Sequence, residues 1–275
     1  MSNYLIAGEI NNSGRLWVVN SQTLNIVKTL TVSDDDDLNG IAYDPVRDRY
    51  IIANRFGIIY EYTLAGDTLT RVVISSSITG YTFQGLAYDS VRPRVLLSYS
   101  KTGGRDGIRE YTPGSYNRPL LESDFNLRAS IDAPFAITYV PVSSPRVIVF
   151  NNEVLDEVVQ FAPGSYTSQS PTSTTLTTAI NPTGATYDTD LSKTVFMTSG
   201  SAAKLHFFTH GSYAAPTSVS DLPAALRAAG VVLRGIAFQF VATTGFNHVR
   251  GGVKYNKVIR GGTTYNKAIR GGITY

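Results

Sequence analysis

The chain has 275 residues, of which 43% are hydrophobic and 16% charged, the composition of a folded protein with one large domain or two ordinary ones. It has no cysteine, which excludes disulfides and thiolate metal sites. No stretch has the apolar length of a membrane span, and the first residues lack the pattern of a signal peptide. We therefore expect a protein made in the cytoplasm without a signal peptide.

Charge is distributed unevenly along the chain. The net charge is +3, yet residues 245–275 contain six of the 24 basic residues and none of the 21 acidic ones. The other 18 basic residues leave residues 1–244 with a net charge of −3. The sequence thus predicts a mildly acidic body, residues 1–244, followed by a basic arm, residues 245–275.

Three β-strands are predicted at the start of the chain, at residues 3–9, 14–20 and 25–32, where apolar and β-branched residues predominate. Five similar units follow. Their equivalent positions are Gly40, Gly85, Ala136, Gly184 and Gly235, which are 45, 51, 48 and 51 residues apart. This period is typical of a four-stranded propeller blade.

Each unit begins with a phrase such as "GIAYD" or "GLAYD", where glycine suits an inner strand that is crowded at the axis. The recurring Asp44, Asp89 and Asp188 are typical of a turn, because aspartate accepts backbone hydrogen bonds there. Three units contain "PGSY" or "HGSY", whose glycines (Gly114, Gly164 and Gly211) predict a further turn. A short capped helix is predicted at residues 220–230.

Only one strand of a unit remains after residue 235, and the three N-terminal strands can complete it as a fifth blade. The phrases "LNGIAYDPVRDRYIIAN" and "SGRLWVVNSQTLNIVKTL" resemble β-propeller repeats of the NHL and lactonase-like kind. The resemblance implies an all-β, five-bladed propeller over residues 1–244, followed by a β-prone tail. It does not imply an activity, because propellers include hydrolases, lectins, scaffolds and virion proteins.

One reading is a calcium-dependent hydrolase. Its candidate ligands are Asp34, Asp37, Asn39 and Glu153, since the resemblance to lactonases suggests a metal-binding asparagine at Asn39. An acidic run on a loop is more often solvated charge, however, and the chain lacks the early glutamate motif of lactonases. No catalytic motif or metal-ligand spacing involves the three histidines, His206, His210 and His248. We predict no catalytic residues, metal or cofactor.

A second reading is a lectin-like protein that binds a glycan or a cell surface. Tyr116, Tyr166 and Tyr213 recur at equivalent positions and could form a ligand-binding rim. The alternative is that each tyrosine packs against its own outer strand. The two interpretations remain open from the sequence.

The arm consists of the units "HVRGGVKYNK", "VIRGGTTYNK" and "AIRGGITY", each a short β-prone piece with a turn expected at Asn-Lys. Nucleic-acid binding and a disordered tail are alternatives. The matched Val249, Ile259 and Ile269 favour a third interpretation, in which the arm adds strands to another subunit or partner. The expected binding residues are Arg250, Lys254, Tyr255, Lys257, Arg260, Tyr265, Lys267, Arg270 and Tyr275.

These observations favour a non-catalytic structural protein whose arm links copies of itself or another structural protein, such as a phage decoration, tail or fibre component. The lectin-like protein is the alternative, and the hydrolase is the third. We do not expect nucleic acid or a membrane as a partner.

Overall fold

The computed structural model describes residues 2–10, 13–32, 37–75, 77, 80–101, 106–124, 134–151, 157–166, 172–178, 180–239, 244–250, 253–260, 263–270 and 273–274. Side chains are described for these residues except 124, 134, 135, 151 and all those from 244 onward. Within this part of the chain, no helix is long and apolar enough to cross a membrane.

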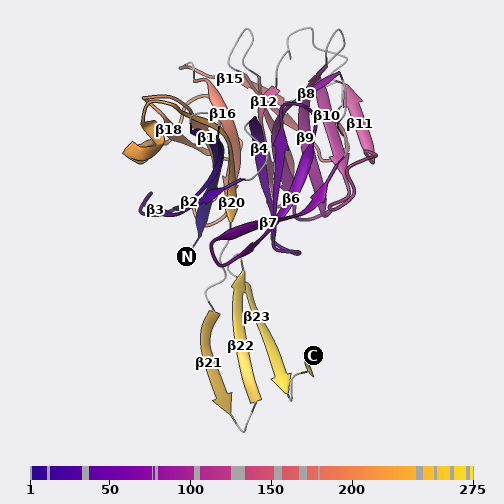
Figure 1. The fold of residues 1–275 in the computed structure, drawn as a ribbon, viewed down its shortest axis with the longest axis vertical. Helices are drawn as coiled ribbons and strands as arrows, with labels where there is room; N and C mark the ends of the chain where they lie inside the picture. The colour runs from indigo at the N-terminus through magenta and orange to yellow at the C-terminus, as the bar shows by residue number, and fades with distance from the viewer. Residues whose placement is uncertain are drawn as a thin grey trace.

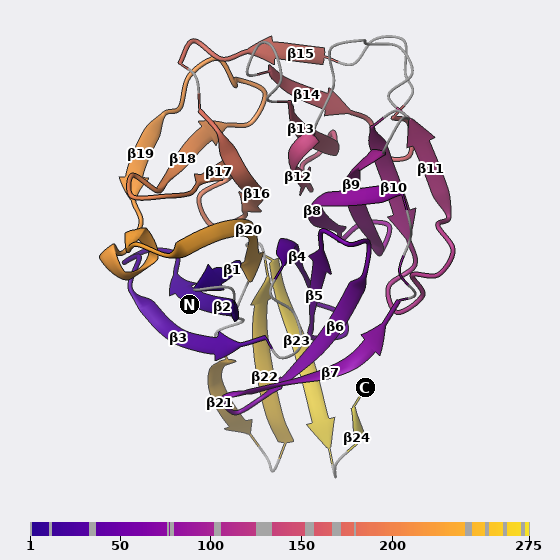
Figure 2. The ribbon, with the colours of Figure 1, turned by 45° about the horizontal axis from the view of Figure 1, so that its top comes forward.

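Five four-stranded antiparallel sheets surround a common axis as the blades of a propeller (Figures 1 and 2). Blade 1 contains β4 (Leu38–Asp44), β5 (Arg49–Asn54), β6 (Ile59–Ala65) and β7 (Thr68–Ile74). Blade 2 contains β8 (Tyr81–Asp89), β9 (Arg94–Lys101), β10 (Gly107–Tyr111) and β11 (Leu121–Asp124). Blade 3 contains β12 (Pro134–Val140), β13 (Arg146–Asn151), β14 (Glu157–Phe161) and β15 (Thr172–Thr175). Blade 4 contains β16 (Pro182–Asp188), β17 (Lys193–Thr198), β18 (Lys204–Thr209) and β19 (Ser218–Asp221).

The fifth blade joins the two ends of the propeller. Its inner strand is β20 (Val231–Gln239), which pairs with β1 (Asn3–Ile10), followed by β2 (Ser13–Asn20) and β3 (Ile26–Thr31). The predicted closure by three N-terminal strands and one C-terminal strand is confirmed. This pairing closes the ring, because blade 5 holds strands from both ends of the propeller sequence.

Glycine at the start of an inner strand lets neighbouring blades approach closely at the axis. A Cβ atom on Gly40 would lie 2.8 Å from the backbone nitrogen of Leu86 in the next blade. The same distance separates a Cβ on Gly184 from the nitrogen of Ile236, and a Cβ on Gly235 from the nitrogen of Ile41. The predicted crowding at the axis is therefore confirmed, and it explains the glycine in "GIAY".

The recurring aspartates form turns, as predicted. Asp44 Oδ1 accepts hydrogen bonds from the backbone nitrogens of Val46 (2.9 Å) and Arg47 (3.3 Å), which shapes the turn between β4 and β5. Asp89 and Asp188 accept equivalent pairs of bonds. The side chain of each aspartate is fully buried, so its backbone hydrogen bonds offset part of its desolvation.

Gly114, Gly164 and Gly211 have φ values of 82°, 80° and 79°, the left-handed conformation that the predicted turn requires. The segment predicted as a capped helix is a single 3₁₀ turn, η1 (Ala224–Arg227), without a side-chain cap. Pro223 stands at the N-cap position and has no hydroxyl, amide or carboxylate to accept the first backbone hydrogen bonds, so the turn does not extend into an α-helix.

The basic arm forms a separate sheet with one strand for each ten-residue repeat. Its strands are β21 (Thr244–Arg250), β22 (Val253–Arg260), β23 (Thr263–Arg270) and β24 (Ile273–Thr274), in that order. They pair with one another and with no described blade strand. The turn expected at Asn-Lys is wrong, because Asn256 pairs with Lys267 within β22 and β23. The strands are separated at the Gly-Gly positions instead.

Candidate functional site: an axial cavity and a repeat arm

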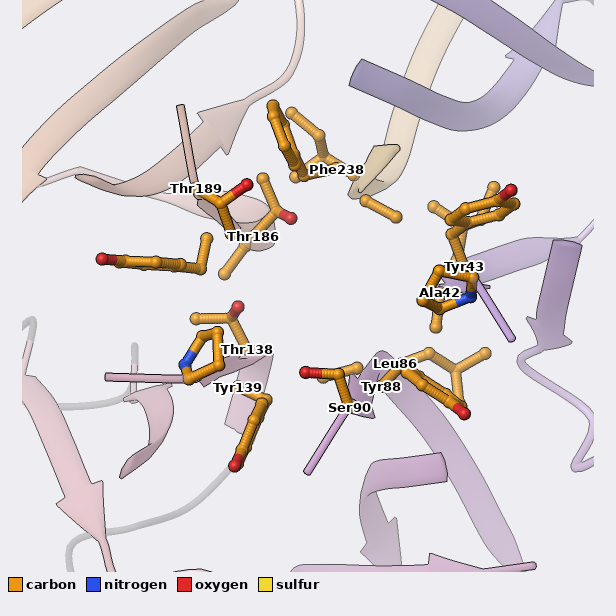
Figure 3. Close-up of a pocket in the computed structure, with 18 residues that line it drawn as sticks. Ala42, Tyr43, Leu86, Tyr88, Ser90, Thr138, Tyr139, Thr186, Thr189 and Phe238 are labelled. Carbon is orange, nitrogen blue, oxygen red and sulfur yellow. The ribbon is translucent and has the colours of Figure 1, made fainter. Parts of the chain in front are cut away.

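A cavity of about 200 Å³ lies on the axis, on the face where each inner strand turns into the second strand of its blade (Figure 3). All five inner strands contribute to its wall. The turn residues Pro45, Ser90, Pro141 and Thr189 also line it. Towards the level of the axial glycines, the space narrows to a void of about 10 Å³.

Five aromatic side chains, one from each blade, surround this cavity. They are Tyr43, Tyr88, Tyr139, Tyr187 and Phe238. They occupy the fourth position of the "GIAY" phrase in every unit, so the repeat already contained the signal for them. Sequence reasoning missed this set because it looked for ligand residues on the opposite face and in the outer turns.

The tyrosine hydroxyls are used by the protein itself. Tyr43 donates a hydrogen bond of 2.7 Å to Asp48. Burial, and then the Asp44 carboxylate of the preceding blade, raise the pKa of Tyr88. Burial and Asp89 raise the pKa of Tyr139 in the same way. These tyrosines therefore stay neutral at physiological pH.

No charged side chain is present among the 18 residues that line the cavity. Its polar groups are hydroxyls, including those of Thr138 and Thr186, whose residues are only 3% and 6% exposed. The cavity suits an uncharged ligand, because a charge placed there would lose its hydration without gaining a counterion.

Tyr116, Tyr166 and Tyr213 do not form the exposed rim that the sequence suggested. They are only 2%, 2% and 0% exposed, so their rings are unavailable to a ligand. The alternative interpretation, that they are packing residues, fits the structure. It also shows that the packing is between blades: Tyr166 of blade 3 donates a 2.5 Å hydrogen bond to Glu110 of blade 2.

Two of these tyrosines belong to ionic clusters that join neighbouring blades. Arg47 bridges Asp44 (2.6 Å) and Glu61 (2.5 Å) in blade 1, and Tyr116 of blade 2 donates a hydrogen bond to Glu61. Arg92 bridges Asp89 and Glu110 in the same way. Tyr213 differs, because its hydroxyl lies 3.1 Å from both Thr194 Oγ1 and His210 Nδ1 in its own blade. These clusters account for the recurring Asp, Arg and Tyr as structural residues.

The residues considered for calcium are not brought together where the structure describes them. Asp37 forms a 3.0 Å ion pair with Arg55, and Asn39 donates a 2.6 Å hydrogen bond to the carbonyl of Phe83. Asp34 and Glu153 lie outside the described residues. Among those described, no group of three or more His, Asp or Glu side chains is placed to hold a metal ion.

Two of the three histidines lie in or beside blade 4, and His248 lies in the arm, where side chains are not described. Burial and the Lys204 ammonium lower the pKa of His206. Burial and Arg146 lower that of His210. Both are therefore largely neutral at physiological pH.

The pairing register of the arm explains how a sheet with six cations and no anion can form. Each basic residue stands opposite an uncharged one: Arg250 opposite Val253, Lys254 opposite Val249 and Ile269, Lys257 opposite Gly245 and Asn266, Arg260 opposite Thr263, Lys267 opposite Asn256, and Arg270 opposite Ile273. A slip of one residue between β22 and β23 can place Lys257 opposite Lys267. Like charges in direct opposition destabilise a strand pair, so this register is favoured.

Comparison with known proteins identifies the fold. No family model matches the chain, and no curated protein matches it. A structure described as a nidogen/laminin complex superposes with a TM-score of 0.58 at 13% identity, covering 87% of this chain and 99% of that chain. The chain is a five-bladed β-propeller.

Two further solved structures are less similar. The dihydro-heme d1 dehydrogenase NirN, in complex with DHE, matches with a TM-score of 0.45 at 12% identity, covering 92% of this propeller chain and 48% of that chain. A functionally unknown protein from Desulfotomaculum acetoxidans DSM 771 matches with a TM-score of 0.48 at 12% identity, covering 80% and 78%. The nidogen/laminin likeness, at 13% identity, is one of fold alone.

Proposed function

We propose that this propeller is a non-catalytic assembly protein whose C-terminal arm joins copies of the chain through strand pairing. The observation that carries the proposal is the register of the arm. Position p of one eight-residue strand pairs with position 9 − p of the next, as in the reciprocal pairs Asn256–Lys267 and Lys257–Asn266. A pairing with this symmetry can be repeated between identical strands of two chains.

The physical argument rests on the edges of the arm sheet. β21 is one edge, and the two residues of β24 pair only with Ile269 and Arg270 of β23. The unpaired backbone groups of an edge strand are a template for a strand from another chain. A second copy that pairs in the same register again sets every cation opposite an uncharged residue, so the repeat supports association despite its charge.

The arm begins on the cavity face. Phe238, in the last strand of the propeller, lines the cavity, and the arm starts at Thr244, five residues after Gln239. An extended chain places Thr244 within about 18 Å of Gln239. The turns on this face expose Val46 (66%) and Val91 (62%) at equivalent positions, and Leu191 (51%) one position later in the turn of blade 4. Apolar side chains displayed together in this way favour a protein interface here.

Pairing at one edge of the arm sheet joins two chains as a two-fold dimer, and pairing at both edges links successive chains into a filament. Virion decoration, tail and fibre proteins are assemblies of this kind, and we place the chain among them as part of the same proposal. The cavity supports a non-catalytic role, because its described lining offers no acid, base or charged group for chemistry.

The test is the solution mass of the full chain and of a version that ends at Thr243, measured by light scattering at low and high salt. We expect an oligomeric full chain and a folded monomeric truncation. Pairing between arms should strengthen as salt screens their charges, whereas binding of the arm to an acidic propeller surface should weaken. A full chain that stays monomeric at high concentration contradicts the proposal.

A further inference from the structure

Two threonine hydroxyls that the protein does not use line the axial cavity. Thr138 on β12 and Thr186 on β16 are 3% and 6% exposed and line the cavity. Neither hydroxyl makes a hydrogen bond to the part of the chain that the structure describes. Neither hydroxyl oxygen is fully enclosed by protein, so both are open to the cavity, where a ligand or water can complete their hydrogen bonding.

The two hydroxyls give the cavity a polar side and an apolar side. Figure 3 shows Thr138 and Thr186 together on one side, opposite Ala42 and Leu86. The two threonines occupy the third position of the "GIAY" phrase in blades 3 and 4. The other three blades have Ala42, Ala87 and Ala237 at that position. At this position of the repeated phrase, a hydroxyl is therefore present only in blades 3 and 4.

The five aromatic side chains around the cavity determine which other groups a bound ligand can contact. The Tyr43 hydroxyl is bonded to Asp48, and those of Tyr88 and Tyr139 lie beside carboxylates of the preceding blade. These side chains present ring carbon to the cavity, as does Phe238. Aromatic carbon comes from every blade, the hydroxyls of the inner strands lie on one side of the cavity, and the turn residues Ser90 and Thr189 add two more hydroxyls to its lining.

From this arrangement we infer that the cavity binds one uncharged sugar ring. A sugar has an apolar C–H face that packs on aromatic side chains and an edge of hydroxyls that pairs with Thr138 and Thr186. The volume of about 200 Å³ is many times the roughly 10–15 Å³ that suffices for one water molecule, and it is sufficient for a single ring. A charged sugar is excluded, because no described lining residue offers a counterion.

The inference is independent of the proposed assembly, because the described cavity walls come from the inner strands and their turns and not from the arm. Either can fail while the other stands. Oligomeric mass tests the arm, whereas ligand binding to the full chain tests the cavity.

The experiment is saturation-transfer NMR on the full chain with methyl glycosides of glucose, galactose, mannose and N-acetylglucosamine. Glucuronate and glucosamine serve as charged probes. The test variant is Thr138→Val with Thr186→Val, which removes both hydroxyls and nearly preserves shape. The matched control is Thr29→Val with Thr70→Val, two exposed threonines on outer strands.

We expect at least one neutral glycoside to bind, and its affinity to fall by at least about tenfold in the cavity variant while the control is unchanged. Failure of all four neutral glycosides to bind overturns the inference. So does binding that survives in the cavity variant, or equal binding of the charged probes. If the double variant does not fold, Thr138→Val and Thr186→Val are measured separately, and unchanged binding in both overturns the inference.

Discussion

Tyr4 donates a 2.5 Å hydrogen bond to Asp188, which lies 184 positions away in the neighbouring blade. Tyr88 and Tyr139 lie beside the aspartate of the preceding blade, but the equivalent residue in blade 5 is Phe238, which has no hydroxyl. Tyr4 packs on Phe238, with ring centroids 5.9 Å apart, and supplies the missing donor. The first strand therefore contributes a specific polar contact to ring closure as well as strand pairing.

Replacing Tyr4 by phenylalanine should destabilise the protein by about 1–3 kcal/mol, because the buried Asp188 carboxylate loses the donor to its Oδ2 atom and keeps only the two backbone donors to Oδ1. Burial raises the pKa of Asp188 and the Tyr4 bond opposes that rise, so the variant should raise this pKa further. A carboxyl whose pKa is raised in the folded state destabilises the protein when it is ionised and ceases to do so when it is protonated. The stability lost in Tyr4→Phe should therefore be largest at neutral pH and become smaller as Asp188 is protonated.

Urea unfolding of wild type and Tyr4→Phe at neutral pH and at about pH 4 measures both effects. Combining Tyr4→Phe with Asp188→Asn completes a double-mutant cycle that isolates the pair. An equal loss of stability at the two pH values argues against a role for the ionised carboxylate.

The fold followed from the sequence because its strongest constraints recur with the blade. Gly40, Gly85, Gly184 and Gly235 mark the inner strands, since an added Cβ would meet the neighbouring blade. The cavity was not predicted, because the residues that make it are also ordinary strand residues. From the sequence, an aromatic side chain at the end of an inner strand is equally consistent with core packing and with lining a cavity. Only the arrangement of the blades around the axis shows that five of these side chains surround one space.

The clusters between blades show a second limit of the sequence. Tyr116 and Tyr166 recur in identical "PGSY" phrases, which is equally consistent with a binding rim and with packing. Their partners, Glu61 and Glu110, are 55 and 56 residues earlier in the chain and are brought to them only by the stacking of blades. Such contacts depend on the angle between blades, which a local pattern does not specify.

Alanine at Gly40 should be far more disruptive than alanine at Gly85. The added Cβ at Gly40 would meet backbone atoms of the next blade at 2.8 Å, whereas at Gly85 its nearest neighbour is a side-chain atom of Ile137 at 3.2 Å. We expect a loss of about 3 kcal/mol, or failure to fold, for Gly40→Ala and about 1 kcal/mol for Gly85→Ala. Thermal unfolding compares them, and similar losses would show that the axis can expand.

The ionic cluster of blade 1 should be sensitive to the loss of one charge. Glu61→Gln leaves Arg47 and Asp44 without their third member and should cost about 3 kcal/mol, the lower end for a buried pair because Arg47 is one-third exposed. The control is Glu122→Gln, since the carboxylate of Glu122 is 35% exposed and pairs with Arg109. Glu122→Gln should lower the free energy of unfolding by less than Glu61→Gln does in the same denaturant titration. A larger loss for Glu122→Gln would contradict the idea that burial of the carboxylate makes the blade 1 cluster important.

In blade 3, a carboxylate can be added where blade 1 has one, instead of removed. Gln160 occupies the position of Glu61 and Glu110, but Val140 replaces the aspartate of the turn there. Gln160→Glu would place a carboxylate at an 8% exposed site in a blade whose turn lacks that aspartate–arginine pair. It should therefore destabilise the protein at neutral pH and less so in acid, where the added carboxyl is neutral. A pH-independent effect would show that packing rather than charge is responsible.

The register of the arm makes a final prediction that distinguishes charge position from charge number. Asn266→Lys places a cation opposite Lys257, whereas Thr264→Lys adds the same charge opposite Ile259, as the preceding repeat already does with Lys254. Direct opposition of like charges should weaken β22–β23 pairing by about 0.2–1 kcal/mol, and the matched variant should be nearly neutral. Amide hydrogen exchange over residues 253–270 measures the difference, with faster exchange expected for Asn266→Lys. Self-association should fall in the same order, because pairing between chains uses the same register. If both variants exchange and associate alike, the positions of the cations do not govern how the arm pairs.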